Sequence, residues 1–334
     1  MTVLALTLGE PAGIGPEIVV KAWAALRESG PAFMVIGDAQ SLEAASAAGR
    51  SIIRPVTGPK QALAVFPTAL PVLNLPLSTP VVSGQPSPAA APSVIRWIET
   101  AVGLTLAGDV SGIVTAPIAK APLYEAGFAF PGHTEFLGEL TSSIRQDGAR
   151  GPIMLLTAAD LRVSLVTIHE PLSRVPSLLT IERIVNAGLV TAQALRRDFG
   201  IEGPRLAVTG LNPHAGESGA LGGEEIAIIE PAVRALRDLG VDATGPHPSD
   251  SLFHAEARTR YDAALCMYHD QALIPVKMLD FWGGVNVTLG LPLVRTSPDH
   301  GVGFDIAGRG LARADSLIAA IRLAQAMTDR RAGA

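Results

Sequence analysis

Ala263-Ala264-Leu265-Cys266-Met267-Tyr268-His269-Asp270-Gln271 is the most informative stretch of the chain, because an apolar run stops here at an imidazole and a carboxylate. A buried strand that ends in a loop of reactive side chains is typical of a parallel sheet in an α/β protein, where ligands lie at the carboxyl ends of the strands. His269 could therefore ligate a metal, and Asp270 could orient that ligand or act as a base. The alternative is that His269 only caps the strand.

Polar side chains continue downstream among glycines and prolines, at Lys277, Asn286 and Arg295. Lys277 and Arg295 could hold an anion, Arg295 in bidentate fashion, and Asn286 could bond a hydroxyl or a carboxylate. Taken alone, Arg295 is better explained by a surface ion pair. Together with His269, these side chains favour a ligand site over separate structural roles.

Two more apolar runs end in a histidine. Residues 161–167 lead to His169, and residues 205–210 lead to His214. If all of these runs are parallel strands, their histidines stand where ligands bind in open α/β sheets. Three neutral imidazoles with an open coordination position would suit a divalent metal that binds a substrate. The chain has no local H-x-x-x-H pattern, so unrelated loop histidines remain the alternative.

A further anion site is indicated by Gly132-His133-Thr134, which precedes an apolar helical run. This spacing places an imidazole and a hydroxyl at a helix N-terminus, where free N–H groups favour anions. Alternatively, Thr134 is only the N-cap of that helix. The loop from Gly9 to Gly15 resembles a phosphate loop, yet it fits neither nucleotide-binding glycine pattern.

Composition limits the classes of function. The chain has 334 residues, enough for a large core and two lobes, and a formal net charge of −5. With no basic run, nucleic-acid binding is not expected. The single cysteine, Cys266, excludes an intrachain disulfide framework and a Cys-rich zinc site, and fits a small core residue. No apolar run is long enough to span a bilayer, and the N-terminus resembles a strand, so we expect a cytoplasmic protein without membrane contact.

Short apolar runs alternate with helical spacing along the chain, as in a sheet covered by helices. Residues 245–250 are predicted to form a loop in which Asp250 is an N-cap, and His247 and His254 are expected to have structural roles. Residues 54–92 are rich in proline, serine and alanine and define few elements, apart from a candidate strand at 71–75. We predict further strands at 3–8, 32–37 and 112–115, and helices at 16–28, 40–49, 93–107, 180–199, 222–239 and 313–329.

Several motifs together resemble the 4-hydroxythreonine-4-phosphate dehydrogenase family. They are Gly9-Glu10-Pro11-Ala12-Gly13-Ile14-Gly15-Pro16, Gly132-His133-Thr134-Glu135, Gly210-Leu211-Asn212-Pro213-His214-Ala215-Gly216-Glu217, Tyr268-His269-Asp270-Gln271, Gly284-Val285-Asn286-Val287-Thr288-Leu289-Gly290-Leu291-Pro292 and Arg295-Thr296-Ser297-Pro298-Asp299-His300-Gly301. The resemblance runs nearly end to end and implies a two-lobed α/β/α sandwich resembling the isocitrate/isopropylmalate dehydrogenase-like fold. The cofactor-side lobe is expected at residues 1–125 and 300–334, and the metal, substrate and dimerisation lobe at residues 126–299.

The resemblance implies an oxidoreductase that needs a divalent metal, zinc, magnesium or cobalt, and uses NAD or NADP. The family oxidises 4-phosphohydroxy-L-threonine to 2-amino-3-oxo-4-phosphooxybutanoate. This product loses carbon dioxide to give 3-amino-2-oxopropyl phosphate, in the synthesis of pyridoxal 5′-phosphate (vitamin B6). The resemblance also implies a homodimer with its sites shared between subunits, because one metal ligand of the family comes from the opposite subunit.

Matching positions carry the family's site residues into this sequence. The resemblance assigns the metal to His169, His214 and His269, and Asp270 and Lys277 are the expected catalytic residues. Val302 stands where the family usually has Thr or Ser after His-Gly, which removes one hydroxyl near the expected cofactor. Substrate binding is assigned to His133, Thr134, Lys277, Asn286 and Arg295, and cofactor binding to His300, Gly301, Asp305 and Gly308.

Two other functions fit part of the pattern. The first is a sister dehydrogenase for D-threonate or D-erythronate 4-phosphate, which would keep the metal and the architecture. The same superfamily also includes a dehydrogenase for a terephthalate dihydrodiol. The second is a phosphate acyltransferase on a related two-lobed fold, although acyl transfer to phosphate needs neither a metal nor NAD. A substrate panel tests the first alternative, and NAD binding tests the second.

Overall fold

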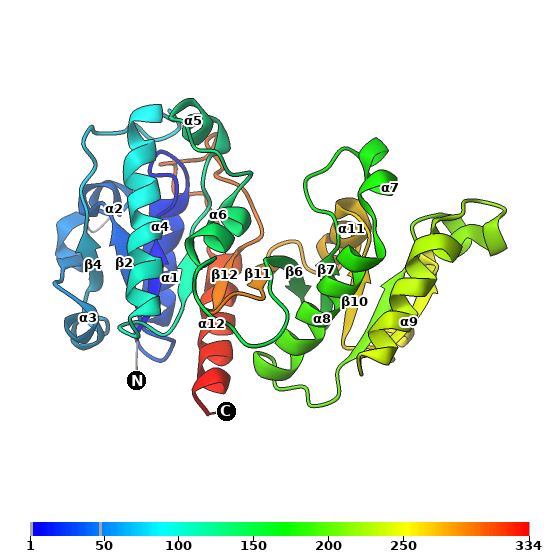
Figure 1. Ribbon diagram of the computed structural model, residues 1–334. Helices are drawn as coiled ribbons and strands as arrows, with labels where there is room; N and C mark the ends of the chain where they lie inside the picture. The colour runs from blue at the N-terminus through cyan, green and yellow to red at the C-terminus, as the bar shows by residue number, and fades with distance from the viewer. Residues whose placement is uncertain (1–2, 47–48, 334) are drawn as a thin grey trace. The chain divides into compact units, whose positions relative to one another are not determined.

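The chain forms a mixed α/β structure in which helices pack on β-sheets, as the sequence predicts (Figure 1). The computed structural model describes residues 3–46 and 49–333. Two compact units make up the chain: the first comprises residues 1–143 and 293–329, and the second comprises residues 144–292 and 330–334. None of the helices in the described residues combines the length and the apolar character needed to cross a bilayer.

The residue boundaries of these two units differ from those predicted for the two lobes. Residues 126–143 and 293–299 belong to the first unit, although the sequence placed them in the other lobe. Residues 330–333 belong to the second unit, although the sequence placed them in the cofactor-side lobe. Strand pairing and helix packing explain the difference. Arg295 aligns with Ile113 in a parallel strand pair, and the helix that begins at His133 contacts the helix that begins at Ala91. The roles assigned to the two lobes stay predictions.

The first unit contains a parallel sheet in the order β3-β4-β2-β1-β5-β12. Every residue of β1 and β2 is buried, as expected for strands that are covered on both faces. The strands are β1 (Leu4–Thr7), β2 (Phe33–Gly37), β3 (Ile53–Pro55), β4 (Leu70–Asn74), β5 (Ile113–Thr115) and β12 (Arg295–Pro298).

Helices cover both faces of this sheet because its connections run in opposite directions. α1 (Gly15–Leu26) lies between β1 and its neighbour β2, whereas α4 (Ala91–Leu106) leads from β4 back across β2 and β1 to β5. Right-handed crossovers then place the two helices on opposite faces, and Figure 1 shows α4 in front of the strands. The other helices are α2 (Ala39–Ala45), α3 (Pro59–Val65), α5 (Lys120–Glu125), α6 (His133–Leu140) and α12 (Asp315–Gly333), with 3₁₀ turns at Gly49–Ile52 and Pro88–Ala90.

The second unit contains a mixed sheet in the order β11-β6-β7-β10-β8-β9. β10 is parallel to its neighbours β7 and β8, and β9 is parallel to β8, whereas β6 is antiparallel to both β7 and β11. The carboxyl ends of β7, β10 and β8 therefore lie at one edge of the sheet. The strands are β6 (Ile153–Ala158), β7 (Leu161–Leu165), β8 (Arg205–Thr209), β9 (Asp242–His247), β10 (Ala263–Cys266) and β11 (Val285–Leu289).

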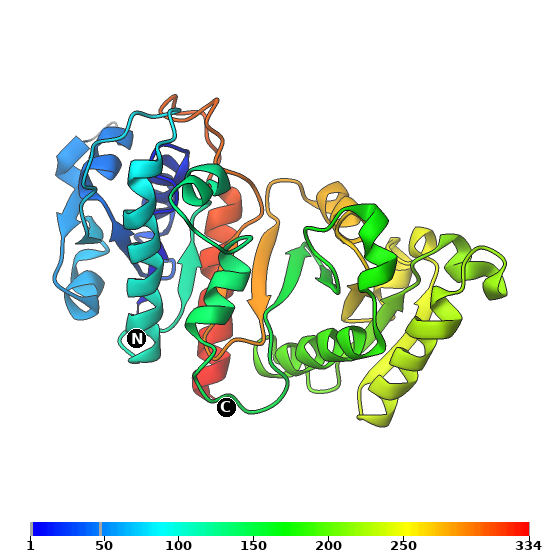
Figure 2. The same ribbon diagram turned by 45° about the horizontal axis from the view of Figure 1, so that its top comes forward.

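Successive residues of β10 face two different hydrophobic cores. Leu265 packs into the core formed with α8 (Ile181–Arg197) and α9 (Glu230–Asp238), which lie side by side (Figure 2). Cys266 packs into the core formed with α11 (His269–Leu279), so it is the small core residue that the sequence predicts, and burial raises the pKa of its thiol. Shorter helical segments are Leu172–Arg174, α7 (Val175–Leu178), Pro213–Gly219, the π-helical Glu225–Ile229, Ser249–Ser251 and α10 (Ala255–Arg258).

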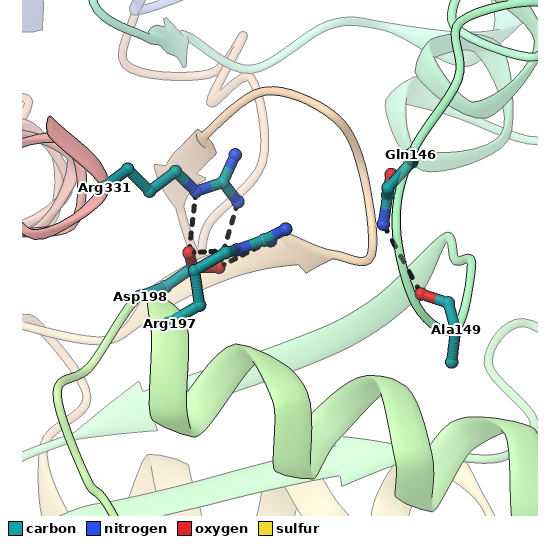
Figure 3. Close-up of polar contacts among 5 residues, drawn as sticks. All are labelled: Gln146, Ala149, Arg197, Asp198 and Arg331. Atoms are coloured by element: carbon teal, nitrogen blue, oxygen red, sulfur yellow. Dashed lines mark hydrogen bonds and ion pairs between the residues drawn. The ribbon is translucent and has the colours of Figure 1, made fainter. Parts of the chain in front are cut away.

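The last turn of α12 is held by Asp198, a buried residue directly after α8. The carboxylate of Asp198 accepts hydrogen bonds from Arg331 at 2.6 and 2.9 Å and from Arg197 at 2.8 and 3.1 Å (Figure 3). Burial acts to raise the pKa of Asp198, but the two guanidinium groups outweigh it and hold the pKa below its usual value. This cluster connects Arg331 to the end of α8, in agreement with the grouping of residues 330–333 with the second unit.

Two local predictions are wrong. Residues 245–247 are not part of a loop but the end of β9, because β9 pairs with β8 as far as His247. Asp250 is not an N-cap either, because it lies within a 3₁₀ turn, and Nδ1 of His254 accepts the capping hydrogen bond at the start of α10.

Candidate functional site

Neighbouring parallel strands of the second unit each lead into a predicted metal ligand. β10 aligns with β7 on one side and with β8 on the other, so the segments that follow leave the same edge of the sheet. His169 follows β7, His269 begins α11 shortly after β10, and His214 follows β8. The predicted metal site requires these strands to be parallel neighbours, and the sheet topology meets that requirement.

Two of these imidazoles are neighbours. The ring centroids of His169 and His269 are 5.9 Å apart, and the ring planes meet at 42°. His169 is exposed and the side chain of His269 is 36% exposed, so solvent reaches both rings. Neutral imidazole nitrogens are common ligands of zinc and other divalent metals. A pair of adjacent, accessible rings fits two of the ligands that the sequence predicts.

Asp270 orients the ring of His269. Nδ1 of His269 lies 2.7 Å from Oδ1 of Asp270. A carboxylate can only accept a hydrogen bond, so the proton of the neutral ring resides on Nδ1 and the lone pair on Nε2. A carboxylate behind a histidine is the usual way to present the other ring nitrogen to a metal. Of the two roles left open for Asp270, this contact favours orientation of the ligand.

His214 lies in a segment of unusual backbone conformation. His214, Ala215, Glu217 and Ser218 have φ angles from 43° to 56°, and Gly216 has a φ of 80°. The left-handed helical conformation costs about 1–2 kcal/mol for each non-glycine residue, so other contacts must hold this turn.

A complete metal site is not formed by one chain within the described residues. Across residues 3–46 and 49–333, no three His, Cys, Asp or Glu side chains form a group that could hold a metal ion. One chain therefore offers the imidazole pair of His169 and His269. The role of His214 as a metal ligand stays a prediction.

Glu225 supplies contacts that hold the His214 turn. Its buried carboxylate accepts hydrogen bonds from the N–H groups of Leu211 and Asn212, both at 2.7 Å, and from the Asn212 side chain at 2.9 Å. Burial acts to raise the pKa of Glu225, but these hydrogen bonds outweigh it and lower the pKa. A Cβ on Gly216 would lie 2.7 Å from Oε2 of Glu225, so the carboxylate also packs against the turn itself. No local sequence pattern marks Glu225, because only the fold brings it to this loop.

In the first unit, α6 begins at His133 with an open N-terminus. Its N-cap is Gly132, which has no side chain to accept a hydrogen bond from the first turn. Thr134 is therefore not the N-cap, and the alternative explanation of its position is wrong. The N–H groups of an uncapped first turn are available to an anion.

His133 has a buried ring nitrogen that no group of the described chain satisfies. Nε2 of His133 is buried and has no hydrogen-bond partner. Burial, together with the positive charge of Arg295, lowers the pKa of His133 well below 6.5, so the ring is neutral at physiological pH. A buried polar atom without a partner in a native structure is a natural contact for a ligand.

Arg295 is a buried cation that interacts with the first turn of α6. It is 3% exposed, and one of its terminal nitrogens donates a hydrogen bond to Oγ1 of Thr115 at 2.7 Å. Burial lowers the pKa of the guanidinium to about 9, and the carboxylate of Glu135 partly counteracts this effect. The group still carries its charge at neutral pH. A guanidinium, a neutral imidazole and an open helix N-terminus together suit a phosphate or a carboxylate.

Lys120, which is not among the predicted site residues, is a further cation near this N-terminus. A Cβ on Gly132 would lie 3.7 Å from Cε of Lys120. The signal in the sequence was Ala116-Pro117-Ile118-Ala119-Lys120 directly after an apolar run. A single lysine in such a loop resembles any solvated charge, so the signal was weak.

Two predicted substrate-binding residues lie in the second unit. Lys277 is in the last turn of α11, half-buried, with its Nζ 5.2 Å from the ring centroid of Phe281. Asn286 lies on β11, and its Oδ1 is buried without a hydrogen-bond partner. An amide oxygen in this state can accept from a hydroxyl or an amino group of a ligand.

The predicted cofactor residues lie along an irregular loop of the first unit. Nδ1 of His300 is 3.0 Å from the carbonyl oxygen of Gly301, and Asp305 is exposed. Gly308 borders a cavity of about 210 Å³, whose lining also includes Gly13, Asp38, Gln40, Ser41 and Ser83. The polar lining fits part of a nucleotide, whereas His300, Gly301 and Asp305 do not line this cavity.

Comparison with known proteins identifies the family. The family described as pyridoxal phosphate biosynthetic protein PdxA matches residues 30–324. The chain is also 70% identical, over 328 residues that cover 98% of both chains, to the 4-hydroxythreonine-4-phosphate dehydrogenase of Caulobacter vibrioides. The chain belongs to the PdxA family. Membership confirms the resemblance seen in the sequence motifs.

Solved structures of similar proteins share the fold. The 4-hydroxythreonine-4-phosphate dehydrogenase of Klebsiella pneumoniae is 41% identical with a TM-score of 0.85, and the match covers 98% of this chain and 100% of that one. The terephthalate 1,2-cis-dihydrodiol dehydrogenase of Burkholderia xenovorans is 30% identical with a TM-score of 0.64, covering 98% of each chain. Proteins similar to this chain are therefore named for different substrates.

Proposed function

We propose that this chain oxidises 4-phosphohydroxy-L-threonine with NAD or NADP, in the synthesis of pyridoxal 5′-phosphate. The product, 2-amino-3-oxo-4-phosphooxybutanoate, is a β-keto acid that loses carbon dioxide to give 3-amino-2-oxopropyl phosphate. The observation that carries this proposal is the 70% identity, over 98% of both chains, to a relative named 4-hydroxythreonine-4-phosphate dehydrogenase. The residue geometry of each unit supports it separately.

Residues of the first unit bind the phosphate in this proposal. Arg295 supplies a charge that is buried and still protonated, and it can bond two phosphate oxygens at once. The first-turn N–H groups of α6 and the hydroxyl of Thr134 add donors. His133, as a neutral ring with a buried and unpartnered Nε2, adds a further hydrogen bond.

Residues of the second unit hold a divalent metal in this proposal. The imidazole pair of His169 and His269 supplies two ligands, and in the neutral ring of His269 the contact of Nδ1 with Asp270 leaves Nε2 to face a metal. His214 is assigned as the third ligand, from a second copy of the chain in a homodimer. Such a metal supplies Lewis-acid chemistry, which lowers the pKa of a substrate hydroxyl and stabilises negative charge on a carbonyl oxygen.

Two further side chains of the second unit are assigned to the substrate on their own chemistry. The buried Oδ1 of Asn286 can accept a hydrogen bond from the amino group or the hydroxyl. Lys277 provides a cation for the carboxylate, or the proton that replaces carbon dioxide on the product. The cofactor is assigned to the loop that holds His300, Gly301 and Asp305, and to the cavity beside Gly308.

The test is NADH formation by the purified protein, followed at 340 nm with Mg²⁺, Zn²⁺ or Co²⁺. The panel contains 4-phosphohydroxy-L-threonine, D-threonate 4-phosphate, D-erythronate 4-phosphate and terephthalate dihydrodiol. We expect turnover of the first compound only, because a site that bonds an amino group rejects analogues that lack it. Preference for a sugar-acid phosphate or for the dihydrodiol would support oxidation with NAD or NADP but would contradict the proposed substrate. No NAD or NADP reduction with any of them would contradict the oxidoreductase assignment.

Removal of the metal provides a second test. Treatment with a chelator should abolish turnover, and added Zn²⁺, Mg²⁺ or Co²⁺ should restore it. The variant His269→Ala should not be restored by the same additions, because one of the paired rings is lost. Full activity of the chelator-treated protein would contradict the metal assignment.

A further inference from the structure

Gln271 joins three strand ends through one side chain. It stands in the first turn of α11 and is 8% exposed. Its Oε1 accepts hydrogen bonds from the N–H of Met267 at 2.7 Å and from the hydroxyl of Thr209 at 2.8 Å. Its Nε2 donates to the carbonyl of Gly210 and to the hydroxyl of Ser249, both at 2.7 Å. A side-chain amide has two N–H donors and two acceptor lone pairs, so each of them is used here.

The peptide groups of Met267 connect two of the predicted metal ligands. Met267 precedes His269 by two residues, and its N–H is held by Gln271. Its carbonyl accepts hydrogen bonds from the N–H of Thr167 at 3.2 Å and from the hydroxyl of Thr167 at 2.7 Å. Thr167 in turn precedes His169 by two residues. The pair of rings at 5.9 Å thus stands on backbone that is tied together at Met267.

The Nε2 of Gln271 contacts the segment that leads to His214. Gly210, which accepts from Nε2 of Gln271, precedes His214 by four residues. The intervening residues are held by Glu225, so the path from Gln271 to His214 contains little free backbone. One buried side chain therefore contacts the segments of His269 and His214 directly and that of His169 through one peptide.

We propose that Gln271 is a positioning residue for the imidazole sites. It sets the spacing between the segments of His169 and His269, and it fixes the segment from which His214 reaches the site of the other subunit. The inference rests on the proposed metal function. It also explains the residue type. A glutamate has the same shape but no donors, and its charge would face the carbonyl of Gly210. A methionine keeps the length of the side chain and loses all the hydrogen bonds.

The test compares Co²⁺ binding by the full-length wild-type protein and by Gln271→Met and Gln271→Glu. The measurements are Co²⁺ affinity in competition with a chelator, the visible absorption of bound Co²⁺, and the melting temperature of the metal-free protein. The matched control is Tyr261→Phe, which removes one buried hydrogen bond, to the carbonyl of Leu252 at 3.1 Å, near the opposite end of β10. It is far from the histidine segments along the strand.

Both Gln271 variants should bind Co²⁺ about 10–100-fold more weakly and with a changed visible spectrum, as is typical when a residue behind the ligands is lost. Tyr261→Phe should lower the melting temperature and leave both Co²⁺ measurements unchanged. If Gln271→Met does not fold, Thr209→Val removes a single bond of the set and should still change the spectrum.

A lower melting temperature with wild-type Co²⁺ affinity and spectrum would overturn the inference, because the amide would then support only the fold. The metal proposal fails in a different way. Wild-type protein that shows no saturable Co²⁺ binding, or binding that His269→Ala does not weaken, would overturn the metal function and the role of Gln271 with it.

Discussion

At the scale of single residues, burial separates explanations that the sequence leaves open. Arg295 could be an anion ligand or half of a surface ion pair, and its 3% exposure excludes the surface pair. Its guanidinium donates a hydrogen bond to the hydroxyl of Thr115, 180 residues away in the chain. Burial of this kind depends on pairing between distant strands, so local sequence could identify the residue but not its environment.

The phosphate assignment predicts a specific change in kinetics. Arg295→Lys should raise the KM for the phosphorylated substrate about 10–100-fold, because lysine cannot form the bidentate contact and each charge-assisted hydrogen bond contributes about 1.5–3 kcal/mol. Steady-state kinetics measure the effect. Thr115→Val is the control, since it removes the partner hydroxyl and keeps the guanidinium, and it should raise KM less. An unchanged KM in Arg295→Lys would remove Arg295 from the substrate site.

His133 predicts how stability depends on pH. Its pKa in the folded protein lies well below 6.5 because of burial and Arg295, so the unfolded chain binds a proton that the folded chain does not. Stability should therefore fall as the pH is lowered from 6.5, by up to about 1.4 kcal/mol per pH unit from this residue. Urea unfolding from pH 8 to pH 5 should show a smaller decrease for His133→Gln than for the wild type. Parallel curves would show that the ring does not resist protonation.

At the scale of elements, α8 and α9 pack closely because of a glycine. A Cβ on Gly188 would lie 2.7 Å from both terminal carbons of Leu236. Gly188→Ala should therefore destabilise the protein by about 1–3 kcal/mol through overpacking. Leu236→Ala removes the clash, so the double variant should lose less stability than the sum of the single variants, as measured by urea unfolding. Additive losses would show that the helices can move apart.

Elements with strong periodicity could be predicted well, and those held by distant contacts could not. The helix expected at 180–199 is α8, Ile181–Arg197. The helix expected at 222–239 instead begins with a π-helical segment at Glu225, whose carboxylate holds the loop of His214. No local pattern indicates a left-handed turn, because the residues that make it are ordinary and the contacts that stabilise it lie outside the segment.

At the scale of the whole molecule, the proposed homodimer makes a prediction about mixed subunits. The imidazole pair comes from one chain and His214 is assigned to the other, so His214→Ala and His269→Ala dimers should each be inactive. Dimers that contain one subunit of each kind keep one complete site. Unfolding and refolding an equal mixture should therefore restore about a quarter of the wild-type activity, since half of the dimers are mixed. No recovery, with dimers confirmed by light scattering, would place the three histidines within one subunit.

The predicted site illustrates what strand order reveals and what it does not. Three strand-end histidines were visible in the sequence, and the parallel pairing of β7, β10 and β8 brings their segments to one sheet edge. The sequence did not identify Glu225 or Lys120, because neither belongs to a local motif. Each gains its position only when separate segments of the chain are folded together.

The division of the chain also has a consequence for its synthesis on the ribosome. β5 ends at Thr115, but its partner β12 begins only at Arg295, after the whole segment 144–292 of the other unit. At a translation rate of about 5–20 residues per second, the emerging chain carries β5 without that partner for roughly 10–40 s. An unpaired strand edge can join to other chains. The interval in which a nascent chain most needs a chaperone therefore ends when the C-terminal strand leaves the exit tunnel.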